Sequence, residues 1–262
     1  MLLVASFGTT AAESRRLNID AVEQVTGEAA GDAWSVRRCF TSQTVIGIIE
    51  KREGIRIDNV RDAVRRALSE GARYLAVQPT HLMKGLEYDK LKETLSDYAG
   101  SFEGLSLGDP LLSSDEDLER LADALTEASA GYEDGETALV FMGHGTDAAS
   151  NDVYTKLQST FSSRGKTDYF IGTVEAEPSL EDVIAAAGMR SYRRAVIRPL
   201  MLVAGNHAIN DMASADDPGS WYSRFSALGY DTLCITEGLG QIPAVRAIYA
   251  DHAQRAIESL KR

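Results

Sequence analysis

The sequence predicts an α/β protein made of two similar lobes, each with a mainly parallel β-sheet flanked by helices. Two observations support this prediction. Short apolar runs alternate with segments of helical periodicity along the chain, which is the pattern of βαβ units. The order of these segments then repeats after the stretch 131–135, whose two glycines and two acidic residues make it the clearest linker.

The first half is expected to contain four strands and five helices. The run 2–6 is a short buried strand that ends at Gly8, and 58–71 is the strongest helix because its apolar residues fall on one face. The expected strands are 2–6, 34–41, 73–79 and 105–107. The expected helices are 10–27, 44–52, 58–71, 88–98 and 114–130.

The second half repeats this order of strands and helices. The expected strands are 137–142, 169–175, 194–202 and 232–236. The expected helices are 151–161, 179–187, one from about Asn206, and 242–260. We therefore expect an N-terminal lobe at 1–130 and a C-terminal lobe at 136–262, with the option that the last helix packs back on the first lobe.

Two segment matches in the same order indicate an internal duplication. Ser-Phe-Gly-Thr-Thr at 6–10 corresponds to Gly-His-Gly-Thr-Asp at 143–147, and each run closes the first strand of its half. A second match follows the strands at 73–79 and 194–202, where six positions separate a proline from a glycine in both halves. Ligands in open α/β sheets bind beyond the carboxyl ends of the strands. The duplication therefore places four side chains around one cleft between the lobes: Phe7, Glu87, His144 and His207.

Composition excludes several classes of protein. The net charge is −12, which argues against a general binder of nucleic acid or of a membrane surface. The N-terminus is expected to form the first strand, because it lacks the basic flank and the longer apolar core of a secretory signal. No apolar run reaches the roughly 18 residues of a membrane span. We expect a cytoplasmic protein, in which Cys39 and Cys234 serve packing because they show no CxxC spacing.

The candidate chemistry centres on His144, one of four histidines, which stands between two glycines at a strand end. Glu175 ends another strand, and His207 follows a third. Two histidines and a carboxylate form a ligand set for a borderline divalent ion such as Co(II), Fe(II), Ni(II) or Zn(II). Simpler roles stay open: a surface turn for either histidine, and complementation of a helix N-terminus for Glu175 and Glu177. No phosphate-binding loop, dinucleotide fingerprint or serine-nucleophile elbow is present.

These segments also carry a resemblance to a known family. Gly143–Thr146, Val174–Glu175 and above all Pro199–Met212 resemble the anaerobic sirohydrochlorin cobaltochelatases, the CbiK type of class II chelatase. The segments 6–10 and 78–88 are also similar to that family, so the resemblance covers nearly the whole chain. The run from Leu200 to Met212 is a specific signal, whereas the Gly-His-Gly-Thr turn alone is not.

The resemblance implies a bilobal chelatase-like fold with its active cleft between the lobes. It implies a lyase that inserts Co(II) into a sirohydrochlorin-type tetrapyrrole without ATP, in the anaerobic biosynthesis of cobalamin. His144, Glu175 and His207 are the implied metal ligands. His144 is also positioned to take pyrrole protons, and Glu87 matches an acidic position of the family that faces the cleft.

Substrate contacts are expected from residues that follow the first strand of each half. Phe7, Thr9, Thr10 and Thr146 are the candidates for binding the ring and its carboxylates. The expected partners are the tetrapyrrole, sirohydrochlorin or precorrin-2, and Co(II) bound as substrate, with no organic cofactor. Insertion of Fe(II) or Ni(II), a carrier without chemistry, and assembly into a homo-oligomer stay open.

Overall fold

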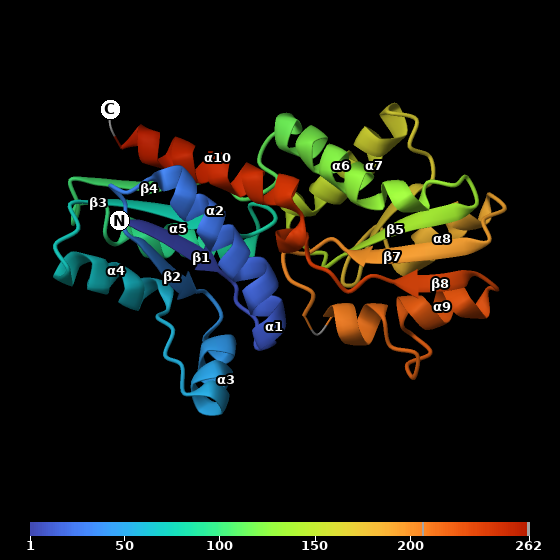
Figure 1. Ribbon diagram of the computed structural model, residues 1–262, viewed down its shortest axis with the longest axis horizontal. Coiled ribbons are helices and arrows are strands. Elements are labelled where there is room, and N and C mark those ends of the chain that lie inside the picture. The colour runs from blue at the N-terminus through green and yellow to red at the C-terminus, as the bar shows by residue number, and fades with distance from the viewer. Residues whose placement is uncertain (206, 261–262) are drawn as a thin grey trace. The chain divides into compact units, whose positions relative to one another are not determined.

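The chain folds into two compact units, of which the computed structural model describes residues 1–205 and 207–260 (Figure 1). The first unit comprises Met1–Ser113 together with the C-terminal segment that begins at Pro243. The second unit comprises Ser114–Ile242. These limits differ from the lobes expected from sequence, because helix α6 (Asp115–Ser129) packs on α7 (Asp152–Ser163) in the second unit.

The first unit contains a parallel sheet in the order β2-β1-β3-β4, covered by helices on both faces. Buried residues of α4 and α5 pack on one face of this sheet, and α10 packs on the other face through Ala253 and Ile257. Burial on both faces explains the unbroken apolar strand runs. The strands are β1 (Leu2–Ser6), β2 (Val36–Phe40), β3 (Tyr74–Pro79) and β4 (Gly104–Leu107). The helices are α1 (Ala12–Ser14), π-helical η1 (Arg15–Asp20), α2 (Ala21–Ala30), α3 (Gln43–Glu53), α4 (Val60–Ser69), α5 (Leu86–Ser96) and α10 (Pro243–Ser259).

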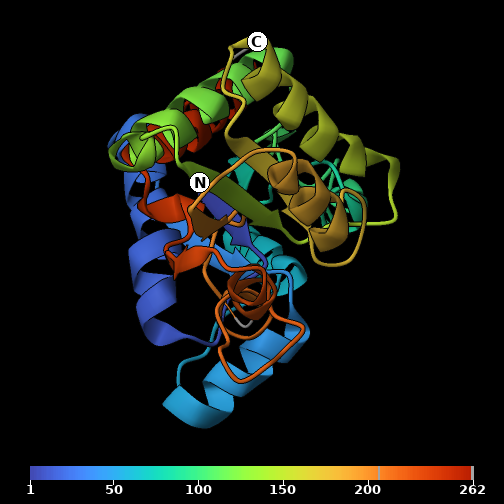
Figure 2. The same cartoon turned by 90° about the vertical axis from the view of Figure 1, so that its right-hand side faces the viewer.

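The second unit repeats this architecture with the order β6-β5-β7-β8. Phe141, Phe161 and Tyr169 stack on one side of its sheet, and the core that includes Trp221 and Phe225 fills the other side. Figure 2 shows the helices of this unit around its strands. The strands are β5 (Thr137–Gly143), β6 (Tyr169–Thr173), β7 (Arg194–Pro199) and β8 (Asp231–Cys234). The helices beside α6 and α7 are α8 (Leu180–Gly188), α9 (Trp221–Ala227), π-helical η4 (Ala208–Met212) and the 3-10 turns η2 (Ala130–Tyr132), η3 (Ala149–Asn151) and η5 (Leu239–Gln241).

The two sheets share not only strand order but also register. Leu2 pairs with Ala76 between β1 and β3, and Leu139 pairs with Val196 between β5 and β7. When Leu2 is matched to Leu139, the residues that follow the strands also match: Phe7 takes the place of His144. The internal duplication expected from the sequence is thus visible in the backbone.

Two details of the second unit differ from the sequence expectation. In place of the helix expected from about Asn206, the structure has the π-helical turn η4 followed by a separate helix, α9. Asn206 itself lies outside the described residues. Strand β6 ends at Thr173 because the Thr173 hydroxyl accepts the Ala176 N–H and so holds a turn. Within the described residues, no helix combines the length and the apolar character needed to cross a membrane.

Candidate metal centre

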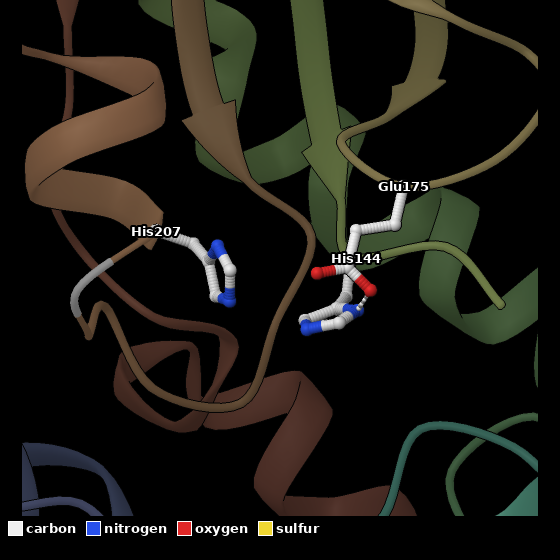
Figure 3. Close-up of side chains that lie close together, drawn as sticks. All are labelled: His144, Glu175 and His207. Atoms are coloured by element: carbon white, nitrogen blue, oxygen red, sulfur yellow. Dashed lines mark ion pairs between the residues drawn. The ribbon is translucent and has the colours of Figure 1, made fainter.

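Three side chains meet at the carboxyl ends of adjacent strands in the second unit. His144 follows β5, Glu175 follows β6 and His207 follows β7. One ligand atom from each side chain lies within 4.8 Å of the others (Figure 3). The structure therefore brings together the three residues that the sequence suggests as metal ligands.

The position of His144 depends on the glycines beside it. A side chain at Gly143 would overlap the Tyr154 ring, and one at Gly145 would place its Cβ 2.8 Å from the Ala176 nitrogen. Gly145 also has a φ of +87°, which other residues adopt at a cost. The Gly145 N–H donates to the Tyr154 hydroxyl, and burial raises the pKa of Tyr154 to about 12, so this hydroxyl stays neutral. The two glycines thus allow a close-packed turn that leaves the imidazole half-exposed.

Glu175 is held beside His144 by the backbone. Its N–H donates to the His144 carbonyl at 2.9 Å, which extends the parallel pairing past the end of the strands. Its Oε2 lies 3.5 Å from the Nδ1 of His144. The carboxylate is exposed and therefore accessible to an ion from solvent.

His207 stands at the start of η4, whose buried residues Ala208 and Met212 anchor it in the core. The rings of His207 and His144 are 4.6 Å apart between centroids and nearly perpendicular, at 79°. The Nδ1 of His207 lies 2.6 Å from the Oδ2 of Asp211, one helical turn further on. Asp211 is not among the site residues expected from the sequence, although its spacing of four residues from His207 is a signal for such a contact.

This arrangement can hold a divalent ion of borderline softness. Two imidazoles and one carboxylate provide mixed nitrogen and oxygen donors, whereas Mg²⁺ and Ca²⁺ prefer oxygen alone. Three protein ligands leave further coordination positions open, which is a feature of sites that exchange ligands. The geometry therefore fits an ion that is held and then passed on.

Two of the other candidate residues, Thr9 and Thr146, form hydrogen bonds with the backbone of their own turns. The Thr9 hydroxyl accepts the Ala11 N–H at 3.3 Å, and the Thr146 hydroxyl accepts the Ala148 N–H at 3.2 Å. Thr9 is buried, and Thr10 and Thr146 are half-buried. Phe7 exposes 50% of its surface, which is unusual for a phenylalanine that follows a buried strand.

Glu177 does not join the three clustered side chains. Its carboxylate accepts the Ser179 N–H at 3.0 Å, beside Asp182, which completes a capping box with Ser179 at the start of α8. Glu177 therefore complements a helix N-terminus, the simpler of the two roles that the sequence leaves open.

Glu87 lies in the first unit, where it borders a cavity of about 330 Å³ together with Thr41 and Lys90. Partial burial raises the pKa of Glu87, but a hydrogen bond from Lys90 at 2.7 Å and further contacts outweigh it, so the pKa lies below its ordinary value. His81 contributes to this electrostatic environment, and burial lowers the pKa of His81 to about 4. Neither ring nitrogen of His81 has a hydrogen-bond partner among the described residues.

Fold and cluster together define the class. Two parallel four-stranded sheets of one topology, flanked by helices, form the bilobal α/β fold of the chelatases. SirB from Bacillus subtilis, in a structure with Fe3+, superposes with a TM-score of 0.66 over 100% of this chain and 97% of its own. The two sequences are only 13% identical, so this likeness concerns the fold alone.

The sequence comparisons define the family. The family model for cobalt chelatase (CbiK) matches residues 1–258, and the chain belongs to this family. It is 35% identical to the sirohydrochlorin cobaltochelatase of Salmonella typhimurium over 256 residues, which is 98% of this chain and 96% of the relative. It is 30% identical to the sirohydrochlorin cobaltochelatase CbiKC of Nitratidesulfovibrio vulgaris over 78% of this chain and 72% of that protein.

Proposed function

We propose that this protein is a sirohydrochlorin cobaltochelatase, which inserts Co(II) into the tetrapyrrole without ATP in anaerobic cobalamin biosynthesis. One observation carries the proposal: in a member of the cobalt chelatase family, the ligand atoms of His144, Glu175 and His207 converge within 4.8 Å. Co(II) is the substrate metal, and the protein needs no organic cofactor for this reaction. We place the reaction in the cytoplasm.

In the proposed mechanism, the three side chains bind Co(II) and hand it to the ring. Insertion forms bonds from the metal to four ring nitrogens and releases two pyrrole protons, so the reaction needs proton acceptors as well as a metal site. An imidazole both binds metal and accepts protons near neutral pH. His144, which is half-exposed, is the proposed acceptor in the second unit.

Glu87 is the second proposed proton acceptor. Its lowered pKa keeps it ionised near neutral pH, and it lies at the position in the first repeat that corresponds to His207 in the second. Its carboxylate is only partly buried, which leaves it accessible to a substrate. An ionised, accessible carboxylate is a competent base for a pyrrole proton.

The substrate contacts follow from the turn residues. Phe7 offers an exposed aromatic face to a flat ring. Thr9 and Thr146 use their hydroxyl oxygens to accept backbone N–H groups, so each keeps its O–H for donation to a substrate carboxylate. Thr10 is the fourth proposed contact and has the same donor. Hydroxyl donors of this kind suit a polycarboxylate substrate in a protein of net charge −12.

An anaerobic assay tests the proposal. Purified protein, in sub-stoichiometric amount, is mixed with sirohydrochlorin and Co(II), and the absorbance change of metallation is followed. We expect many turnovers per protein at a rate well above the spontaneous reaction. A rate equal to the spontaneous one overturns the enzyme and leaves a carrier. Parallel reactions with Fe(II) and Ni(II) test the metal: a faster reaction with either one contradicts the assignment of cobalt.

A further inference from the structure

The two imidazoles of the metal centre differ in the groups that contact their Nδ1 atoms. The Nδ1 of His207 contacts the Asp211 carboxylate at 2.6 Å. The Nδ1 of His144 contacts its neighbour's backbone carbonyl, that of Gly145, at 3.0 Å. Figure 3 shows that the remaining nitrogen of each ring points into the gap between them. Both Nδ1 atoms therefore face an oxygen acceptor. The Nδ1 of His144 also lies 3.5 Å from the Glu175 carboxylate, but Glu175 is itself one of the three clustered side chains. Only His207 has a carboxylate from outside this cluster within hydrogen-bond distance of its Nδ1.

An oxygen acceptor at Nδ1 selects the imidazole tautomer. A neutral imidazole carries one proton, and an acceptor at one nitrogen holds the proton there. The other nitrogen, Nε2, then presents its lone pair. A carboxylate acceptor also increases the electron density of the ring and so strengthens the metal bond. A backbone carbonyl orients the ring with less of this effect.

We propose that Asp211 is a positioning residue that makes His207 the anchoring ligand of the centre. By accepting the Nδ1–H of His207, Asp211 aims Nε2 at the ion and strengthens that bond. The Nδ1 of His144 has the Gly145 carbonyl at 3.0 Å and, further away, the carboxylate of Glu175, which is itself a proposed ligand of the ion. His144 is then the ligand that exchanges when the ion moves to the ring. The role of Asp211 in metal transfer rests on the proposed function. The tautomer of His207 does not, and it can be measured without metal.

The short separation between Asp211 and His207 distinguishes this contact from an ordinary surface pair. The two residues lie four apart on η4, and each exposes roughly two-fifths of its side chain. An exposed ion pair at this spacing contributes little to stability. A purely structural pair would stabilise η4 slightly and would not determine the tautomer of His207. Removal of Asp211 would then leave that tautomer unchanged.

The first test uses the metal-free protein. Long-range ¹H–¹⁵N correlation spectra at alkaline pH report which nitrogen of each neutral imidazole carries the proton, and the four histidines can be assigned with single variants. We expect His207 to be protonated at Nδ1, and Asp211→Ala to shift it to a mixture of tautomers. A wild-type His207 protonated at Nε2 overturns the proposal, whatever the activity of the protein.

The second test measures the metal. We expect Asp211→Asn and Asp211→Ala to weaken Co(II) binding by about 10- to 100-fold in calorimetric titration, with partial rescue by Asp211→Glu. The loss should appear in the KM for Co(II) more than in kcat. Asp216→Asn removes an exposed acidic residue from the segment that follows η4 and is the matched control, for which we expect unchanged affinity. Equal Co(II) affinity in Asp211→Asn and wild type contradicts the proposal.

Discussion

The carboxyl ends of the two sheets share a backbone and differ in chemistry. In the second repeat, the strand-end positions hold His144, Glu175 and His207. Matching registers put Phe7 and Glu87 of the first repeat at the places of His144 and His207. The two repeats therefore present different side chains at equivalent positions. Among the residues that the structure describes, only the second repeat has a cluster of side chains that could hold a metal ion. A fold provides positions, and the residues placed there determine the function.

Ser42 in the first repeat is equivalent to Glu175 in the second, and this pair also shares its backbone hydrogen bond but not its side chain. The Ser42 N–H donates to the Phe7 carbonyl, as the Glu175 N–H donates to the His144 carbonyl. Ser42 caps α3 by accepting the Val45 N–H, so its hydroxyl serves the helix. The glycines that follow Phe7 and His144 both have positive φ, +96° and +87°. The backbone is thus repeated even where the side chains are not.

The largest expected effect comes from removing the ligands of the second repeat. His144→Ala, Glu175→Ala and His207→Ala should each weaken Co(II) binding by about 100-fold or more, because loss of a ligand costs more than loss of an outer-shell partner. Calorimetric titration with Co(II) measures this. The matched controls are the equivalent residues of the first repeat, Phe7→Ala and Ser42→Ala, for which we expect affinity within a factor of about two. A comparable loss in these controls breaks the comparison.

The second prediction separates proton transfer from metal binding. Glu87→Gln should lower kcat by about 100-fold, the smaller end of the range for a general base, and leave Co(II) affinity unchanged. Because the pKa of Glu87 is lowered, its contribution to kcat should be full near neutral pH and fall only as acid protonates it. Asp89→Asn, an exposed acidic residue two positions further along α5, is the control. Weaker Co(II) binding in Glu87→Gln would assign this residue to the metal centre instead.

The third prediction concerns the free energy of unfolding and its dependence on His81. The equivalent residue of the second repeat is Met201: the His81 carbonyl accepts the Leu111 N–H, and the Met201 carbonyl accepts the Leu239 N–H. The folded pKa of His81, about 4, lies below its ordinary value of 6.5. The unfolded chain therefore takes up the proton first. The stability from His81 is complete above about pH 6.5 and is lost as the pH falls toward 4, by about 2 kcal/mol between pH 7 and pH 5.

Urea unfolding at pH 7 and pH 5 measures this loss, with Trp221→Phe so that Trp34 reports on the first unit. His81→Leu should reduce the difference between the two pH values, and Met201→Leu should preserve it. An unchanged difference in His81→Leu would show that another group of the first unit carries the acid sensitivity.

The smallest expected effect concerns a feature that both repeats share. Thr9 and Thr146 occupy equivalent places and make the same hydrogen bond to the N–H two residues on. Thr9→Ala and Thr146→Ala should each cost about 1 kcal/mol of stability and raise the KM for the tetrapyrrole a few-fold. Serine at either position should restore both. If only the stability changes, these hydroxyls serve the turn and do not bind substrate.

The architecture was accessible from the sequence because its signals are local and repeated. Alternating strands and helices, and the match of the segment around Phe7 to that around His144, predict both sheets and their duplication. The approach of His144, Glu175 and His207 also followed, because residues at the carboxyl ends of parallel strands meet at one edge. The sequence therefore predicts the strand-end positions of the three clustered residues.

Features that depend on packing could not be predicted in this way. The expected first lobe includes the helix at 114–130, because the linker after it is the clearest break in composition, whereas α6 packs on α7 of the second unit. The single helix expected from about Asn206 divides into η4 and α9, since no local signal separates them. The burial of His81 and the pairing of Asp211 with His207 depend on the folded surroundings.

The central claim is that the metal binds in the second repeat alone. Crystals of the protein soaked in Co(II), with anomalous diffraction measured at the cobalt absorption edge, test it most directly. The prediction is one strong peak within coordination distance of His144, Glu175 and His207, and no peak beside Phe7, Ser42 or Glu87. A peak at Glu87, or an empty cluster at His144 in cobalt-loaded crystals, would contradict it.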